Sequence, residues 1–187
     1  IAKRHNLIFI VDNCFATPYL QQPIKYGADI VVHSATKLID GQGRVLGGVA
    51  VGRENLIREI YLFARNTGPA MSPFNAWVVL KGLETLDIRM RAQSANALAL
   101  AHWLQAHPAV QCVHYPGLSS HPQHELAMRQ MSGLGGAVLS FEVKVSHVEQ
   151  GRARAFQVLD HLRVMSLSTN LGDTKTLLAH PASTSHG

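Results

Sequence analysis

The first 52 residues alternate short apolar runs with turn-rich connections. Residues 7–11 form a continuous apolar run that ends at Asp12, and residues 30–32 form a second run that leads to Ser34. Continuous apolar runs of this length are typical of strands buried on both faces of a parallel sheet. The connection between them is long enough for a parallel crossover with a short helix. We therefore expect two buried parallel strands, followed by a third strand over 47–51.

Beyond these strands, apolar positions recur every three to four residues, which is the spacing of amphipathic helices. One helix is expected over 54–65. Ser72, followed directly by a proline, signals the start of a second helix, because serine caps helices and proline suits their first position. This helix is expected to continue over 74–106, with Gly82 as a kink or a close packing point, and to end before Pro108.

After residue 107 the pattern changes to shorter elements of both kinds. Strands are expected over 110–115, 137–143 and 164–167, and helices over 124–131 and 148–162. We therefore divide the chain into residues 1–107, a sheet domain with its linking helix, and residues 108–187, the start of a small α+β domain. No apolar run reaches the roughly 18 residues that a membrane-spanning helix requires, so no membrane association is expected.

The composition is that of a soluble intracellular protein. Of the 187 residues, 47% are hydrophobic and 16% are charged, which is enough apolar material for a sizeable core. The chain starts at Ile1 rather than Met and stops at Gly187, so we expect it to be a fragment of a longer protein. Its two cysteines, Cys14 and Cys112, are too few for a disulfide framework, which fits a cytoplasmic location.

The basic residues do not have the distribution of a nucleic-acid-binding protein. The formal net charge is +5, and the densest basic stretches, at 89–91 and 152–154, each fall on a helical pattern. A nucleic-acid interface would show clustered Lys and Arg with interleaved aromatic residues. We therefore interpret both stretches as solvated helix faces and expect no nucleic-acid partner.

Polar side chains collect at the carboxyl ends of the first two predicted strands, where open parallel sheets bind ligands. Asp12 ends the first strand. Ser34, Thr36 and Lys37 follow the second. Each residue alone is more often a turn residue or a solvated side chain, but together they meet the needs of pyridoxal phosphate. That cofactor requires a lysine amine for a Schiff base, an acid that keeps its ring nitrogen protonated, and hydroxyl donors for its phosphate.

The same segments resemble the Cys/Met-metabolism family of pyridoxal-phosphate-dependent enzymes. The run His-Ser-Ala-Thr-Lys at 33–37 is the family's signature, and further similarity covers 11–13, 16–19, 47–48, 68–69, 72–73, 80–86 and 180–183. The resemblance implies an α/β fold of the aspartate-aminotransferase type (fold type I), with part of the large sheet domain and a small α+β carboxy-terminal domain. It also implies that Lys37 is the Schiff-base lysine and that Asp12 pairs with the ring nitrogen. Ser34 and Thr36 would be phosphate ligands.

Further motifs resemble one branch of this family. Asn170 stands where lyases and cystathionine synthases usually have serine, and segments 41–48, 72–77 and 120–125 resemble enzymes that act on succinylated homoserine. The resemblance implies a γ-replacement in methionine biosynthesis, in which sulfide displaces succinate and yields L-homocysteine. Lys37 would be the general base, and Asn170 would position the substrate carboxylate or the lysine. Alternatives within the family are an O-acetylhomoserine sulfhydrylase, a cystathionine γ-synthase, and a methionine or cystathionine γ-lyase.

The resemblance also implies groups outside this chain. Full-length relatives are tetramers built from dimers that share active sites, and a Tyr and an Arg come from the neighbouring subunit. Glycine amides for the phosphate and a stacking aromatic ring lie upstream in the family, and an Arg for the substrate carboxylate lies downstream. The non-catalytic alternative is therefore that the 187-residue chain alone is an inert piece that binds cofactor weakly and does not turn over.

Two other side-chain types require an interpretation. His121 and His124 are three apart, but a proline lies between them and no cysteine or carboxylate completes a site, so no metal is expected. Cys14 is interpreted as a small buried residue rather than as a reactive thiol beside the cofactor.

Overall fold

The computed structural model describes residues 1–184, apart from the side chain of Val148. The chain forms two compact units, Ile1–Ile88 and Arg89–Gly187. A long helix, Leu86–Ala106, begins just before this division. The boundary predicted near residue 107 lies at the carboxy-terminal end of that helix. Most of that helix therefore belongs to the second unit rather than to the sheet unit.

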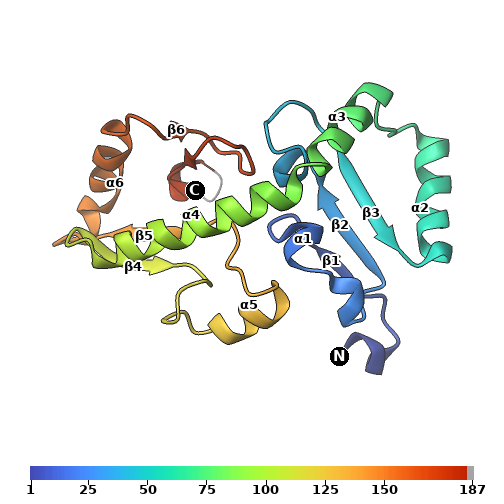
Figure 1. The fold of residues 1–187 in the computed structure, drawn as a ribbon, viewed down its shortest axis with the longest axis horizontal. Helices are drawn as coiled ribbons and strands as arrows, with labels where there is room; N and C mark the ends of the chain where they lie inside the picture. Colours follow the sequence, from blue (N-terminus) through green and yellow to red (C-terminus); the bar gives the residue numbers. More distant parts are fainter. Residues whose placement is uncertain (185–187) are drawn as a thin grey trace. The chain divides into compact units, whose positions relative to one another are not determined.

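The first unit contains the expected three-stranded sheet (Figure 1). Its strands are β1 (Ile10–Asp12), β2 (Ile30–Ser34) and β3 (Gly48–Gly52), in the order β1-β2-β3. β1 and β2 are parallel, as the length of their connection predicts, and Asp12 pairs with Val32. β3 is antiparallel to β2 and pairs Gly48 with Ser34. The sheet therefore brings the end of β1, the end of β2 and the start of β3 to one edge.

Short helices connect the strands and longer ones follow them. They are η1 (Ala2–His5), α1 (Thr17–Leu20), η2 (Pro23–Tyr26), η3 (Ala35–Ile39), α2 (Glu54–Thr67) and α3 (Pro73–Leu83). The start of α3 confirms the capping prediction, since the Ser72 hydroxyl accepts a hydrogen bond of 3.1 Å from the backbone N–H of Asn75. α2 ends at Gly68, whose φ of 92° is in the left-handed region that favours glycine.

The expected continuous helix over 74–106 is in fact two helices, α3 and α4 (Leu86–Ala106). Gly82, near the end of α3, packs directly against η3: a Cβ atom built on Gly82 would lie 2.2 Å from the carbonyl oxygen of Ile39. α3 and η3 also share the buried side chains Ala35, Ile39 and Val79. The glycine thus marks the close packing point predicted from the sequence, because only a residue without a side chain permits this approach.

The expectation that β1 is buried on both faces is wrong. Ile10 is 56% exposed, and the apolar residues Leu7, Ile8 and Phe9 before it are also exposed, whereas Ile30 and Val31 of β2 are buried. The physical reason is that β1 is the edge strand of the three-stranded sheet, so only β2 pairs with it among the described residues. The apolar run reflects a strand suited to burial, but the described part of this chain buries none of the three residues of β1.

The second unit is an assembly of short elements around α4. They are β4 (Val110–His114), α5 (His124–Gln130), β5 (Ser140–Val143), η4 (Val148–Gln150), α6 (Gly151–Asp160), β6 (Ser166–Leu167), β7 (Leu177–Leu178) and α7 (Pro181–Thr184). β4 pairs antiparallel with β5, and β6 pairs parallel with β7. The predicted strands and helices are present, but β5 and β6 are shorter than expected and the helix expected over 148–162 is divided into η4 and α6. The elements β7 and α7 were not predicted.

Tyr115 is the centre of the core of the second unit. It is fully buried with Ala97 and Ala101 of α4 and with Leu118. Its single hydroxyl hydrogen is shared between the carbonyl oxygens of Gly136 (2.8 Å) and Ser94 (3.3 Å). Burial raises the pKa of the Tyr115 phenol to about 12. The loop after β4 is therefore tied to α4 by both packing and hydrogen bonds.

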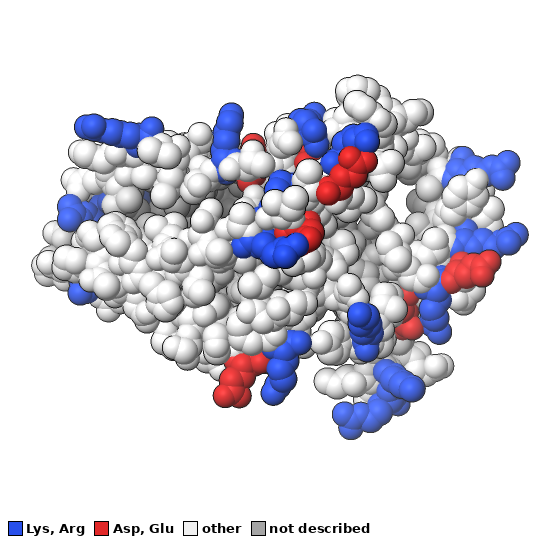
Figure 2. All heavy atoms as spheres, in the orientation of Figure 1, with Lys and Arg blue, Asp and Glu red and all other residues white. Residues whose placement is uncertain are grey.

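The surface carries dispersed charge. On the face drawn in Figure 2, Lys and Arg side chains lie singly or in small groups on both units, with Asp and Glu among them, and form no continuous basic stripe. In the second basic stretch, Arg152 lies over the ring of Phe156 at 5.5 Å and Arg154 donates to Gln157. Among the described residues, no helix combines the length and the apolar character that crossing a bilayer demands.

Candidate active site

The edge at which β1 and β2 end carries the candidate site. Asp12 is the last residue of β1 and Ser34 the last of β2, and the parallel pairing places both strand ends at this edge. The backbone N–H of Asn13 donates to the carbonyl oxygen of Val32 at 2.9 Å, so the pairing continues one residue beyond Asp12. The structure therefore brings together the strand ends that the sequence predicts to meet.

Cys14 links the two strand ends. Its sulfur accepts a hydrogen bond of 2.7 Å from the backbone N–H of Ser34. On the other side, its backbone N–H donates to Asp12 Oδ1 at 3.0 Å, and its thiol also donates to the Asp12 carboxylate. Cys14 is half-buried, close to the interpretation made from the sequence, but it has a role that the sequence did not indicate: it orients the acid.

These contacts determine the ionisation of both groups. The hydrogen bonds from the thiol and the backbone N–H of Cys14 hold the pKa of the Asp12 carboxyl below its usual value, and the nearby His33 lowers it further. The pKa of the Cys14 thiol is raised, first by burial and then by its hydrogen bond to Asp12. At neutral pH this edge of the sheet therefore presents an anionic carboxylate beside a neutral thiol.

The turn after Asp12 is fixed by buried polar contacts. The side-chain amide of Asn13, 3% exposed, donates to the carbonyl oxygens of Thr17 (3.0 Å) and Gln21 (2.9 Å). Thr17 is fully buried and has a φ of 62°, a left-handed conformation that is rare for a β-branched residue. Strain of this kind persists only where the surroundings impose it, and it often accompanies functional sites. The sequence indicated this segment only through its family resemblance.

Lys37 lies on the irregular turn η3, which follows β2. Its backbone (φ −87°, ψ −128°) departs from helical values in the middle of the turn. Hydrogen bonds on either side hold the turn, from Asp40 N–H to the Ala35 carbonyl and from Gly41 N–H to the Lys37 carbonyl, both 2.9 Å. Lys37 itself is half-buried between the buried residues Ala35 and Leu38. The lysine is thus held on a fixed turn rather than on a solvated loop.

An ion pair between the buried Asp40 and the exposed Arg44 anchors the far end of this turn. Asp40 is fully buried, and its carboxylate accepts hydrogen bonds from the Arg44 side-chain Nε (2.8 Å) and backbone N–H (2.7 Å). A buried carboxylate is tolerated only when it is paired in this way. The pair therefore closes the loop after η3 and restrains the segment that carries Lys37.

Thr36 already uses its hydroxyl. The Oγ1 atom accepts a hydrogen bond of 3.0 Å from the backbone N–H of Gly47 and donates to the Gly47 carbonyl at 3.2 Å. A hydroxyl has one hydrogen but two acceptor lone pairs. It can therefore keep its bond from the Gly47 N–H while its hydrogen turns from the Gly47 carbonyl to a phosphate oxygen.

His33 is a site neighbour that the sequence did not single out. It is buried on β2, and within residues 1–184 its Nδ1 atom has no hydrogen-bond partner. Burial lowers the pKa of His33, so its imidazole is neutral at physiological pH. The one sequence feature that could have indicated His33 is its place in the 33–37 motif. Otherwise, a histidine inside a strand is usually a packing residue.

Asn170 belongs to the second unit, in the loop between β6 and β7. Its backbone N–H donates to the Ser168 hydroxyl at 3.2 Å. The same loop is tied to α4 by a hydrogen bond of 3.2 Å from the Gln93 side chain to the carbonyl oxygen of Asp173. The loop that carries Asn170 is therefore anchored within its own unit.

The donor set at the sheet edge fits pyridoxal phosphate. An anionic carboxylate, a half-buried lysine and two hydroxyl-bearing residues lie on adjoining segments, and these are the chemical groups that a pyridinium nitrogen, an aldehyde and a phosphate require. Together with the parallel pairing of β1 and β2, this donor set is consistent with the fold-type-I class of pyridoxal-phosphate-dependent enzymes.

Comparison with known proteins identifies the family. The model of the Cys/Met metabolism PLP-dependent enzymes matches residues 1–187, and the chain belongs to this family, whose cofactor is pyridoxal phosphate. It is 59% identical over its whole length to an O-succinylhomoserine sulfhydrylase of Pseudomonas aeruginosa, covering 45% of that protein. It is 46% identical over its whole length to an L-methionine gamma-lyase of Porphyromonas gingivalis, covering 46% of that protein.

A solved structure confirms the fold class. The chain superposes with a TM-score of 0.93 on a cystathionine gamma synthase of Xanthomonas oryzae pv. oryzae, solved in complex with aminoacrylate and cysteine. The two are 42% identical, and the match covers 99% of this chain and 46% of that one. The chain thus spans less than half the length of the relatives that it matches.

Proposed function

We propose that this chain is part of an O-succinylhomoserine sulfhydrylase, which converts O-succinyl-L-homoserine and sulfide to L-homocysteine and succinate. The observation that carries the proposal is that Asp12 and Ser34 end neighbouring strands and Lys37 lies on the turn that follows. This arrangement is found in a chain 59% identical to an enzyme of that name. Asn170 supports the choice of branch, because it stands where the resemblance assigns serine to lyases and cystathionine synthases. The general activity, replacement or elimination at an amino-acid side chain, is shared by the whole family.

The proposed roles follow from the chemistry of each group. Pyridoxal phosphate, when bound, withdraws electrons from the substrate's α-carbon through its protonated ring. Asp12 keeps that ring nitrogen protonated, a role that its lowered pKa supports because the carboxylate stays anionic. Lys37 Nζ would take the proton from Cα, pass it on to the bound cofactor, and then take one from Cβ, so that the bond between Cγ and the succinyl oxygen can break and succinate leaves. Sulfide then forms the new bond at Cγ, and Lys37 returns protons to the carbon atoms.

Ser34 and Thr36 are proposed to hold the phosphate. Both lie at the junction of β2 and η3, directly before Lys37, so that one short segment binds both ends of the cofactor. Asn170 is proposed to position the substrate carboxylate or the lysine. Arginine, tyrosine and backbone groups from the rest of the protein and from a neighbouring subunit would complete the pocket, in a tetramer of active-site-sharing dimers.

The division into domains and the location in the cell are also proposals. Residues 1–107 would belong to the cofactor-binding large domain and residues 108–187 to the start of the small domain. The free thiols of Cys14 and Cys112 suit a reducing compartment, which supports a cytoplasmic location.

The first test is an absorbance spectrum of the intact protein with added pyridoxal phosphate. We expect a band near about 420 nm that is present in the parent and absent in Lys37→Ala, because only a lysine amine forms the Schiff base. Lys25→Ala, which removes an exposed lysine from η2 in the same unit, is the matched control and should keep the band. An identical band in the parent and in Lys37→Ala would refute the assignment of Lys37.

The second test separates the substrates. The intact enzyme is supplied with O-succinyl- or O-acetylhomoserine, each with sulfide or cysteine, and separately with methionine. Homocysteine formed fastest from the succinyl ester and sulfide supports the proposal. Cystathionine formed from cysteine would indicate a cystathionine γ-synthase instead. Release of a 2-oxo acid and ammonia from methionine would indicate a γ-lyase, the activity named for the relative that is 46% identical.

A further inference from the structure

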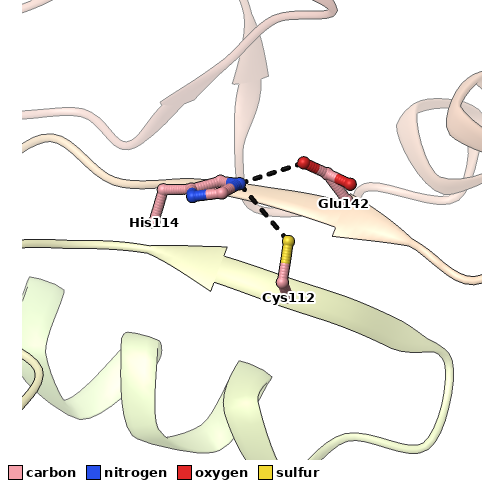
Figure 3. Close-up of side chains that lie close together, drawn as sticks. All are labelled: Cys112, His114 and Glu142. Atoms are coloured by element: carbon pink, nitrogen blue, oxygen red, sulfur yellow. Dashed lines mark hydrogen bonds and ion pairs between the residues drawn. The ribbon is translucent and has the colours of Figure 1, made fainter. Parts of the chain in front are cut away.

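Three potential metal ligands converge on the two-stranded sheet of the second unit. They are Cys112 and His114 of β4 and Glu142 of β5 (Figure 3). Residues two apart on a strand share a face, and the register pairs Cys112 directly with Glu142. Val113 lies on the opposite face and packs against the core around Tyr115. The outer face of the sheet therefore carries all three side chains.

The ligand atoms lie close together around a single imidazole nitrogen. His114 Nε2 is 3.3 Å from Cys112 Sγ and 3.0 Å from Glu142 Oε1, and all three ligand atoms lie within 4.8 Å of one another. The cluster thus combines a thiol, an imidazole and a negative charge.

The arrangement does not suit nucleophilic catalysis. In a Cys–His–carboxylate relay, the thiol and the carboxylate bind opposite nitrogens of the imidazole ring. Here both contact the same nitrogen, Nε2 of His114. Three donors that point at one place instead suit a bound cation.

We propose that Cys112, His114 and Glu142 bind one divalent zinc-type ion, with water as the fourth ligand. Zinc takes sulfur, nitrogen and oxygen ligands in tetrahedral geometry, whereas magnesium and calcium prefer oxygen alone. Zinc bond lengths of about 2.3 Å to sulfur and 2.0–2.2 Å to nitrogen and oxygen require S–N and N–O separations of about 3.6 and 3.4 Å. The present distances of 3.3 and 3.0 Å need to widen by only about 0.3–0.4 Å.

An ion could reach this site from solvent, and its binding would stabilise the β4–β5 sheet. The side chains of His114 and Glu142 are 55% and 62% exposed, so an ion can enter without movement of the backbone. Cys112 lies directly beside an irregularity in the β4–β5 pairing, between Val110 and Cys112. An ion held from both strands would bridge this weak point and stabilise the small sheet. The proposal does not depend on the activity proposed above.

The test measures metal binding by the intact protein in reducing buffer. We expect one zinc ion per chain, determined by competition with a colorimetric zinc chelator. With cobalt in place of zinc, a thiolate-to-cobalt charge-transfer band should appear in the near ultraviolet. Because loss of an outer-shell partner alone weakens metal sites about 10–100-fold, Cys112→Ser, His114→Ala and Glu142→Gln should each weaken zinc binding at least about tenfold.

Matched controls keep the outcome interpretable. His121→Ala removes a histidine of the same unit outside the cluster and should leave zinc affinity unchanged. Of the two cysteines in residues 1–187, Cys14 remains in Cys112→Ser, so a band that is lost in this variant does not come from Cys14. Glu142→Gln changes one exposed atom, so loss of folding is no explanation for its effect, and circular dichroism checks the others. A thiolate–cobalt band that persists in Cys112→Ser, or equal zinc affinity in the parent and Glu142→Gln, would overturn the proposal.

Discussion

Replacing Gly82 with alanine tests whether α3 holds the lysine-bearing turn in place. The new Cβ atom would lie 2.2 Å from the carbonyl oxygen of Ile39, 2.9 Å from that of Asp40 and 3.0 Å from the Asp40 Cα. All three neighbours are backbone atoms, which cannot rotate away. The contact with Ile39 falls about 1 Å short of ordinary packing distance, so α3 must shift away from η3 or η3 must deform.

The size of the effect follows from two opposing terms. Overpacking a closely packed site typically destabilises by about 1–3 kcal/mol, and backbone neighbours favour the upper part of that range. Alanine in place of glycine within a helix returns about 1 kcal/mol through helix propensity. The net loss in the free energy of unfolding is therefore about 1–2 kcal/mol. Cofactor affinity should also fall, because Thr36 and Lys37 belong to the turn that is displaced.

Urea-induced unfolding of the intact protein measures the stability term, and titration with pyridoxal phosphate measures the affinity. Gly151→Ala is the matched control, because Gly151 is also a helical glycine but has nothing within 4 Å of its added Cβ. That variant should be neutral or slightly more stable than the parent. If Gly82→Ala behaves like Gly151→Ala in both assays, the close approach of α3 to η3 does not support the candidate site.

Two further predictions concern single hydroxyl groups. The buried phenol of Tyr115 has a pKa of about 12 against an ordinary value of 10.0, so the unfolded chain ionises first as pH rises, and stability is lost between these values. At pH 11 the parent should therefore have lost about 1.4 kcal/mol of its free energy of unfolding, which Tyr115→Phe should retain. Urea unfolding midpoints of both proteins at pH 8 and pH 11 measure this difference. Equal changes in the two midpoints would contradict the prediction. Thr36→Val should weaken pyridoxal phosphate binding about 10–100-fold, because a hydrogen bond to a charged group is worth about 1.5–3 kcal/mol. Thr36→Ser, which keeps the hydroxyl, should bind nearly as the parent does, whereas equal affinity in the valine variant would remove Thr36 from the phosphate site.

The local features of the fold were predictable because they depend on short-range signals. The apolar runs that became β1 and β2 and the Ser72 cap of α3 are each contained within a few neighbouring residues. The shared edge of Asp12 and Ser34 followed from one further inference, that the connection was long enough for a parallel crossover. These signals required no knowledge of distant contacts.

Other features depend on register and on surroundings that periodicity does not encode. Glu142 joins Cys112 and His114 only because the antiparallel register of β4 and β5 brings residue 142 beside residue 112. The exposure of β1 depends on which strands lie next to it, not on its own composition. The two-residue strand β7 is too short to produce a period of its own.

The neutral thiol of Cys14 has a consequence for the chemical durability of the candidate site. A cysteine reacts with disulfides and polysulfides through its thiolate, and the raised pKa of Cys14 keeps the thiolate fraction at neutral pH small. Sulfide and thiol amino acids do not themselves oxidise a cysteine, but the polysulfides and disulfides that form from them in the presence of an oxidant react with thiolates. Burial of Cys14 and the hydrogen bond from its thiol to Asp12 therefore make this sulfur a poor target for oxidised sulfur compounds.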